Sequence, residues 1–475
     1  MNYLEWEFFE DVIRQPIHTI SDHGPLYFPI KEFTFSRNEN LEIELHLIST
    51  IDSISNATPN PVGSVYFSTD EIRWNGHDGS IATARGITPI MLRRNHGKNE
   101  FTNQIVKIHQ IHWVSNKIAT PYCTIEWLEN MPSHFIWPET HYITETKEYL
   151  TEIKSSSNGF QLSYKTNIKN GTRSCIRINI NGANIIIGEL KEKANHIKKP
   201  GFIIYDGHPN EEEKRKILDC ISFSIGSYLI SLGHTSFDKE SNPIEFVAKS
   251  AIDLVEKMEY VSYWQPAPLC NRFENGISSE NLEKITNSLL KIYDEYSLMS
   301  IFWSYWHAHA APVHMQAAHF GSVIEALQNS HIKNMPLMKK LIEDDDAWSN
   351  FIRKIEPEID SINISEEAKE ILKNKIKNSN TAPQSVILER FMKSIELETS
   401  PLEKKVWSNR NRAAHGGSVN EENAEKIIRG NKILLTILHR ILLKLGNHSE
   451  CYYDFYNINR PRTCIATPII DMQKP

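Results

Sequence analysis

The chain has 475 residues, of which 40% are hydrophobic and 23% are charged. These proportions are those of a globular protein, and they exclude collagen, a coiled-coil rod and wholesale disorder. The 52 Lys and Arg residues against 59 Asp and Glu residues give a net charge of −7. This charge argues against a protein that coats nucleic acid with its whole surface, but not against a nuclease with a local basic cleft.

Cysteine usage and hydropathy indicate a cytoplasmic protein. The six cysteines form no C-x-x-C pair, and the first residues, MNYLEWEFFEDVIRQ, lack the basic and then apolar order of a signal peptide. The most apolar window, 221–232, is shorter than the roughly 20 residues that a membrane span requires. We therefore expect no membrane association.

Residues 1–206 have the pattern of a β-rich domain. Segments with alternating or clustered β-branched and aromatic residues cover 26–35, 41–51, 101–114, 160–167, 174–180 and 184–190. The segments 175–180 and 183–190 flank the turn pair Asn181-Gly182, which predicts a hairpin. Strands at this spacing without helices between them suggest a sandwich or a barrel.

The composition changes after Pro209. A helix is expected over 210–232, followed by a strand over 243–252, so 207–276 is predicted to be a mixed α/β connecting region. The remainder to residue 446 is predicted to be helical, and the aromatic segment 447–475 is predicted to pack on it. The fold class is therefore α+β, with a β-rich N-terminal domain before an all-α domain over 277–446.

Capping residues place several helix starts in this α domain. Helices are expected from Ser279 and over 301–309, 313–330, 335–355, 365–379, 383–397 and 420–445. Ser400 and Glu403 form a capping box with Pro401 at the first helical position, and Ser418 with Glu421 forms a second box.

The segment 407–418, WSNRNRAAHGGS, carries the candidate catalytic residues Arg410, Asn411 and His415. Two glycines follow His415 and are expected to end the helix there, where the helix dipole favours a protonated imidazole. Asn411 lies on the same helical face as His415 and can orient its ring. Arg410 is about 140° away, so it meets His415 only if the helix end unwinds or a second molecule contributes.

An arginine, an asparagine and a histidine are sufficient to cleave RNA through its own 2′-hydroxyl. Arginine binds phosphate oxygens with its planar fork, and histidine exchanges a proton near pH 7. Lys404, Lys405, Arg410 and Arg412 make the segment basic, as phosphate contact requires. The motif contains no carboxylate cluster for Mg²⁺, so we expect neither a metal nor another cofactor.

The R-N-x-x-x-H motif in a C-terminal helical domain resembles the HEPN superfamily of RNases. The segments SYWHAH and FGSVIEALQ resemble its Apea-like branch, and GHDGSIATARGITP resembles the N-terminal domain of ApeA proteins. ApeA-type proteins are bacterial anti-phage, abortive-infection effectors. The resemblance implies a homodimer or higher assembly with a composite metal-independent RNase site made of Arg410, Asn411 and His415. Glu325 matches a position at which an acidic residue assists in some HEPN proteins, but an exposed or structural glutamate is favoured there.

On this interpretation the β-rich half receives a signal, for example from a phage protein, and the helical half then cleaves RNA. Two alternatives remain: a non-catalytic HEPN binding or scaffold module, and a HEPN partner of a nucleotidyltransferase. An intact Arg and His favour the nuclease.

Four further motifs are interpreted as structural. His307, His309, His314 and His319 are expected to be core and capping residues, because i and i+2 diverge on a helix. His448, Cys451 and Cys464 resemble part of a zinc site, but buried thiols are favoured. The glycine-rich 76–86 is expected to be a plain loop, and 344–346 a solvated acidic turn.

Overall fold

The computed structural model describes residues 26–54, 71–76, 78–96, 100–132, 143–145, 150–154, 161–165, 175–189, 199–251, 265–269, 277–410 and 421–472. The chain divides into two compact units. Residues 1–265 and 272–283 form the first, here called the β unit, and residues 266–271 and 284–475 form the second, the helical unit. Each unit is described by itself.

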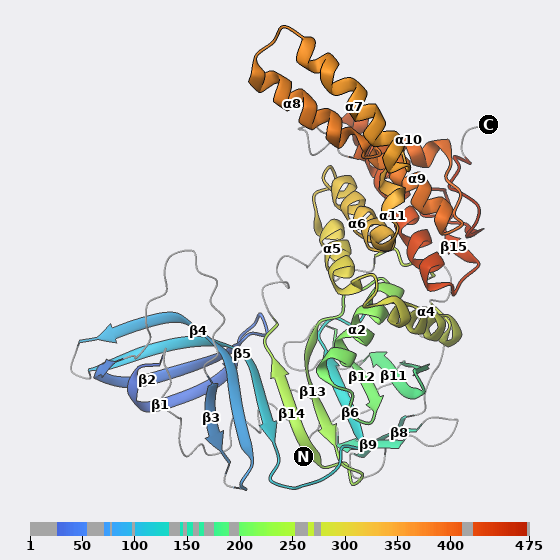
Figure 1. The fold of residues 1–475 in the computed structure, drawn as a ribbon. Helices are drawn as coiled ribbons and strands as arrows, with labels where there is room; N and C mark the ends of the chain where they lie inside the picture. The colour runs from blue at the N-terminus through green and yellow to red at the C-terminus, as the bar shows by residue number, and fades with distance from the viewer. Residues whose placement is uncertain are drawn as a thin grey trace. The chain divides into compact units, whose positions relative to one another are not determined.

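Eleven of the described strands form one antiparallel sheet in the β unit (Figure 1). They are β1 (Phe28–Arg37), β2 (Ile43–Ile54), β3 (Glu71–Asn75), β4 (Ile81–Asn95), β5 (Phe101–Val114), β6 (Cys123–Leu128), β10 (Cys175–Ile180), β11 (Ala183–Glu189), β12 (Gly201–Asp206), β13 (Ser231–Phe237) and β14 (Pro243–Lys249). The order is β1-β2-β5-β14-β13-β6-β12-β11-β10, and β4 pairs with β5 and β3. Among the described residues β1, β3 and β10 each pair on one side only, so the hydrogen bonding does not close the sheet into the expected barrel. The part made of β1 to β5 nevertheless curls around one core, in which Phe35 of β1 stacks on Trp74 of β3 with ring centres 4.8 Å apart.

Residues from the expected connecting region form the centre of this sheet. β14 lies between β5 and β13, and β13 pairs with β6. The predicted helix over 210–232 is too long, because α2 (Glu211–Ile225) ends at Gly226. Gly226 has φ 70°, a left-handed conformation that favours glycine and terminates the helix. The chain then turns and enters β13, whose sequence SLGHTSF has few β-branched or aromatic residues, so its pairing with β6 and β14 rather than its composition makes it a strand.

The predicted hairpin of β10 and β11 is confirmed. Ile180 pairs with Ala183, and the two turn residues have φ 52° at Asn181 and 91° at Gly182. Two positive φ values in succession are what a two-residue hairpin turn requires. A separate three-stranded sheet consists of β7 (Ile143–Glu145), β8 (Leu150–Lys154) and β9 (Gln161–Lys165).

The C-terminal part of the chain is helical, as expected. Its helices are α4 (Ser279–Ile292), α5 (Leu298–Ala310), α6 (Gln316–His331), α7 (Asp345–Ser361), α8 (Glu366–Lys377), α9 (Gln384–Ser394), α10 (Pro401–Asn409) and α11 (Glu421–Gly446). The residue that caps α4 is Ser278, one before the expected Ser279, since its hydroxyl accepts from the Asn281 N–H at 3.2 Å. None of the described helices has the length and apolar content needed to cross a bilayer.

The expected helix over 335–355 is wrong in its first half. Short 3-10 turns cover Ile332–Asn334 and Pro336–Lys339, and α7 begins only at Asp345. The reason is Asp344, whose carboxylate accepts from the N–H groups of Asp346 and Ala347 and caps the helix. The acidic run 344–346 therefore forms the N-terminus of α7, where acidic side chains interact favourably with the positive end of the helix dipole.

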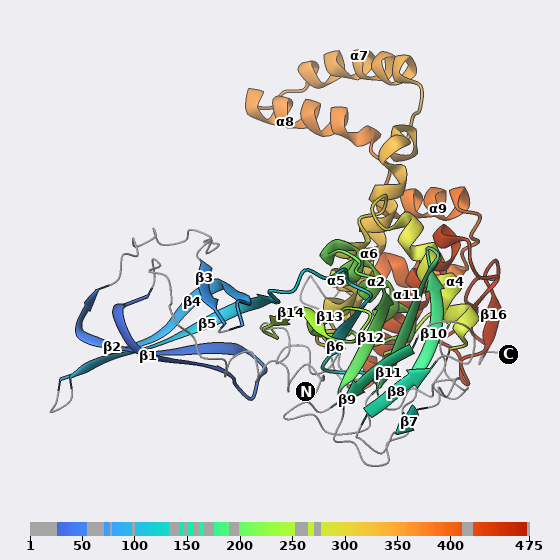
Figure 2. The same cartoon turned by 90° about the horizontal axis from the view of Figure 1, so that it is seen from below.

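Helices α7 and α8 form an antiparallel hairpin that extends away from the other helices of its unit (Figures 1 and 2). The tail carries two short strands, β15 (Cys451–Tyr453) and β16 (Arg462–Cys464), and β15 contacts α11. Tyr452 and Ile469 of the tail are fully buried, so the tail is part of the core of the helical unit.

Candidate functional site

The start of α10 is fixed by the expected capping box. The Ser400 N–H donates to the Glu403 carboxylate at 2.7 Å, and the Glu403 N–H donates to the Ser400 hydroxyl at 3.1 Å. Pro401 stands at the first helical position, where its missing N–H has no helical partner to lose. Local sequence alone therefore determines where this helix begins.

The assigned helix α10 ends at Asn409, and the expected continuation to the glycines after His415 lies outside the described residues. Arg410 is its C-cap residue, with its backbone N–H bonded to the Trp407 carbonyl. The other two expected catalytic residues, Asn411 and His415, lie outside the described residues, so only the arginine can be located.

Arg410 is nearly buried, with 7% of its surface exposed. Its Nη1 donates to the Trp407 carbonyl oxygen at 2.9 Å, and its guanidinium carbon lies 3.8 Å from the centre of the Trp407 ring. Its Nη2 donates to Oε1 of Glu325 in α6, which completes an ion pair. The position that the family resemblance matched to an assisting acidic residue is thus in contact with the motif arginine.

A glycine makes this contact fit. Gly321 lies one helical turn before Glu325 on the same face of α6. A Cβ atom at Gly321 would lie 2.6 Å from Cδ of Arg410, closer than real carbon atoms approach. Any larger residue at this position would displace the Arg410 side chain. The segment FGSVIEALQ therefore provides both the room for Arg410, at Gly321, and its counter-ion, Glu325.

A second arginine–glutamate pair anchors α10 near its start. Arg440 of α11 donates to Glu403 Oε1 at 2.5 Å, and both side chains are buried. The Ile469 N–H of the tail donates to the same oxygen at 3.3 Å, and the Ile465 carbonyl accepts from Arg440 at 3.1 Å. This buried pair joins α10, α11 and the tail.

The histidines over 307–319 do not converge. His309 is enclosed by aromatic rings, with centroids 4.6 Å away at Tyr305 and 5.2 Å away at Phe320, and burial lowers its pKa well below the usual value. His307 donates from Nδ1 to the Trp303 carbonyl one turn earlier at 2.8 Å. In the part of the chain that the structure describes, no group of three or more His, Cys, Asp or Glu side chains is arranged to hold a metal ion.

His448, Cys451 and Cys464, which resemble part of a zinc site in sequence, are not gathered around one point in a metal-binding arrangement. Cys451 and Cys464 lie directly opposite each other on β15 and β16. His448 is largely buried, burial lowers its pKa to about 4, and neither ring nitrogen has a hydrogen-bond partner among the described residues. The expectation of buried thiols is wrong for this pair, since Cys451 is half-buried and Cys464 is exposed.

The expected plain loop at 76–86 is only partly a loop. Asp78 accepts from the N–H and the hydroxyl of Ser80 at 2.9 and 2.6 Å, and Gly79 has φ 81°. These contacts form a turn that leads into β4, which begins at Ile81.

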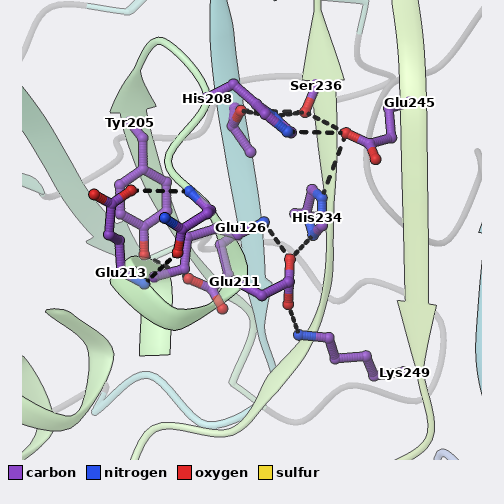
Figure 3. Close-up of polar contacts among 12 residues, drawn as sticks. Glu126, Tyr205, His208, Glu211, Glu213, His234, Ser236, Glu245 and Lys249 are labelled. Atoms are coloured by element: carbon purple, nitrogen blue, oxygen red, sulfur yellow. Dashed lines mark hydrogen bonds and ion pairs between the residues drawn. The ribbon is translucent and has the colours of Figure 1, made fainter. Parts of the chain in front are cut away.

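Sequence reasoning missed a cluster of ionisable residues on one face of the large sheet (Figure 3). The pairing of β12, β6, β13 and β14 places Tyr205, Glu126, His234 and Glu245 on the same face. The N-terminus of α2 covers this face, because Glu211 lies 3.5 Å from His234 and 2.6 Å from Lys249. The sequence feature that could have revealed this cluster is the presence of charged residues inside otherwise apolar strands, as in CTIEWL and PIEFVAK.

Histidines on three segments surround the Glu245 carboxylate, and His112 is hydrogen-bonded to it. Its carboxylate lies 2.7 Å from His112, 3.4 Å from His208 and 3.9 Å from His234. Burial would raise the pKa of Glu245, but the hydrogen bond from His112 and the nearby His234 outweigh this and leave that pKa well below its usual value. His234 is buried, and desolvation lowers its pKa.

The buried charged residues of this cluster, Glu126 and Lys214, have partners, whereas Glu211 is exposed. Tyr205 donates to Glu126 at 2.5 Å, and Lys214 and Lys249 bind Glu211 at 2.5 and 2.6 Å. A buried charge with such partners avoids most of its desolvation penalty. Glu211 thus ties α2 to β13 and β14, Glu245 joins β14 to His112 of β5, and the Tyr205–Glu126 bond joins β12 to β6.

Comparison of the chain with protein-family models, with curated proteins and with solved structures gives no match.

Proposed function

We propose that this protein is an endoribonuclease of the HEPN type that cleaves RNA without a metal ion, with Arg410, Asn411 and His415 as its catalytic residues. In this proposal the helical unit is a HEPN domain that works as a homodimer or higher assembly. The β unit gates it, and the biological role is anti-phage abortive infection with a phage product as activator. The role and the gating rest on the family resemblance.

The observation that carries the proposal is the environment of Arg410. Its guanidinium is held on Trp407, and its counter-ion Glu325 retains 30% side-chain exposure. Arg440 provides the comparison, because its partner Glu403 has 1% exposure. A phosphate oxygen can reach and replace Glu325 as the arginine's partner, whereas the Arg440 pair is closed to solvent.

In the proposed reaction Arg410 binds the phosphate to be cleaved. A base removes the proton of the ribose 2′-hydroxyl, and the resulting alkoxide attacks the adjacent phosphorus. The bond to the 5′-oxygen breaks as the new bond forms, and the protonated imidazole of His415 donates its proton to that oxygen. The products carry a 2′,3′-cyclic phosphate and a 5′-hydroxyl, and the histidine of a second copy serves as the base.

One observation favours a second function, a non-catalytic HEPN binding module. Arg410 is 93% buried and bonded to a backbone carbonyl, a ring and a carboxylate, as a purely structural arginine would be. On this alternative the motif stabilises the junction of α6 and α10 and contacts no RNA.

The decisive experiment compares RNA in cells that produce the full chain before and after phage infection, and repeats the cleavage in a lysate with excess EDTA. Wild type is expected to cut in EDTA and to leave cyclic phosphate ends, and His415→Ala is expected to abolish cutting. His319→Ala, which changes an exposed histidine of α6, is the matched control.

A substrate with a single 2′-deoxy residue at the cut site is expected to resist cleavage there. Equal cutting of the deoxy substrate would contradict internal attack, and loss of cutting in EDTA would contradict metal independence. Intact RNA after infection, together with phage resistance that survives His415→Ala, would favour the binding module.

A further inference from the structure

The tail hairpin places two cysteines opposite each other in a defined register. The Ile465 N–H donates to the Glu450 carbonyl at 2.7 Å, and the Asp454 N–H donates to the Pro461 carbonyl at 3.0 Å. In an antiparallel pair hydrogen-bonded and non-hydrogen-bonded positions alternate. Because Glu450 and Ile465 form a hydrogen-bonded pair, Cys451 and Cys464 occupy the adjacent non-hydrogen-bonded position.

This position suits a covalent link. Opposite Cα atoms at a non-hydrogen-bonded position are about 4.5 Å apart. Disulfides span Cα separations of about 4.4 to 6.8 Å. The register therefore gives the two Cα atoms a separation that a disulfide can span, and both thiols are free.

Reagents in solution reach this pair but not the other described thiols. Cys464 is exposed and Cys451 is half-buried, whereas Cys123, Cys175 and Cys220 are buried. Burial raises the pKa of Cys123 to about 12 and that of Cys220 well above its usual value, which suppresses their reactive thiolates.

We propose that Cys451 and Cys464 are a site of oxidative modification, at which a peroxide converts the two thiols reversibly into one disulfide. The Cys464 thiolate attacks an oxygen of hydrogen peroxide, the O–O bond breaks, and the leaving hydroxide takes a proton to become water. Cys464 is then a sulfenic acid. The Cys451 thiolate attacks its sulfur, the S–S bond forms and a second water leaves. The balance is two thiols and one peroxide to one disulfide and two waters, and a dithiol reverses it.

The disulfide would close the hairpin that anchors the tail. Residues just beyond Cys464 contact the buried Glu403–Arg440 pair through the Ile465 carbonyl and the Ile469 N–H. Linking the strands restricts the unfolded chain over this segment and preserves those contacts. Oxidation is therefore expected to raise the melting temperature of the helical unit, independently of any RNase activity.

The test treats the purified full chain with a small excess of hydrogen peroxide, blocks remaining thiols with an alkylating reagent and digests without reductant. Mass spectrometry is expected to find one cross-linked pair of peptides joined by Cys451 and Cys464, lighter by two hydrogens and separated by dithiothreitol. Cys464→Ser is expected to lose the cross-link and the rise in melting temperature. The matched control, Cys220→Ser, is expected to keep the cross-link.

Two results would overturn the proposal. One is that both thiols can still be alkylated after peroxide treatment. The control for folding is that wild type and Cys464→Ser melt at the same temperature before treatment. The other is that the purified chain contains one equivalent of zinc, whose removal by a chelator is required before either thiol reacts.

Discussion

Two buried arginines of the helical unit have the same kind of surroundings, an aromatic ring and a glutamate. The guanidinium carbons of Arg410 and Arg440 lie 3.8 and 5.2 Å from the ring centres of Trp407 and Tyr452, and each arginine pairs with a glutamate. Stacking on an aromatic ring fixes the plane of the fork and so the direction of its N–H groups. What differs is the partner's access to solvent, since Glu325 is 30% and Glu403 1% exposed. In the proposed function this difference leaves the partner of Arg410, but not that of Arg440, open to replacement by a phosphate.

Arg410→Ala is expected to destabilise the protein as well as to abolish cleavage. From the sequence, an arginine at a helix end should cost at most about 1 kcal/mol on removal. The burial found here raises this expectation to about 1–3 kcal/mol, because Glu325 would lose its partner and Trp407 its stacked neighbour. Urea denaturation of Arg410→Ala, Glu325→Ala and the double variant measures this cost. Full additivity of the two single effects would show that the ion pair contributes nothing.

At the scale of elements, α10 is held by one buried and one exposed glutamate. Glu403 serves the capping box, the Arg440 pair and the tail, whereas Glu389 of the neighbouring α9 binds Lys404 at 2.7 Å in solvent. A buried pair that loses one member leaves an uncompensated charge, whereas an exposed pair is screened by water.

Glu403→Ala is therefore expected to lower the free energy of unfolding by about 3–5 kcal/mol, since it leaves Arg440 buried without its counter-ion. Glu389→Ala, the matched control, is expected to change it by less than about 1 kcal/mol. Both values come from the urea dependence of tryptophan fluorescence. Equal effects of the two changes would mean that Arg440 finds another partner.

The ionisable cluster of the β unit predicts a pH dependence of stability. The pKa values of His234 and Glu245 are both lowered in the folded protein, so the unfolded chain binds more protons in acid. Stability should then fall below pH 6.5 as His234 charges in the unfolded chain, and again below about pH 4.5 as Glu245 does the same. Denaturation midpoints from pH 7.5 to 4 measure this. Glu245→Gln should remove the Glu245 contribution below about pH 4.5 and, because the Glu245 carboxylate raises the pKa of His234, should lower the pKa of His234 further. An unchanged profile would place the cause outside this cluster.

At the scale of the molecule, the α7–α8 hairpin leaves apolar side chains in solvent. Phe351, Ile362 and Ile371 are 41%, 46% and 48% exposed, and Ile359 is the one side chain of the two helices that is buried. Two helices with so little shared core are marginal by themselves. Such a surface is usual where a protein meets a partner.

The chain is expected to form a dimer, or an assembly of dimers, through the helical unit. A two-fold axis supplies the second arginine and histidine that the proposed reaction requires. Multi-angle light scattering at micromolar concentration, with and without RNA, should give an even multiple of the 54.8 kDa chain mass. A monomer under both conditions would remove the base from the proposed reaction.

The sequence alone was sufficient for features that depend on neighbouring residues. The hairpin turn at Asn181-Gly182 and the box of Ser400 with Glu403 were predicted, because φ preferences and caps act over three or four residues. The β-rich and helical halves followed from hydrophobic periodicity in the same way.

Only the tertiary structure decided which distant residues meet. The Arg410–Glu325 pair joins residues 85 apart, and the contact of His112 with Glu245 spans 133. The central position of β13 and β14 likewise depends on strand pairing across long loops. Local sequence carries no record of such pairings, because they are selected by burial and charge compensation in the folded whole.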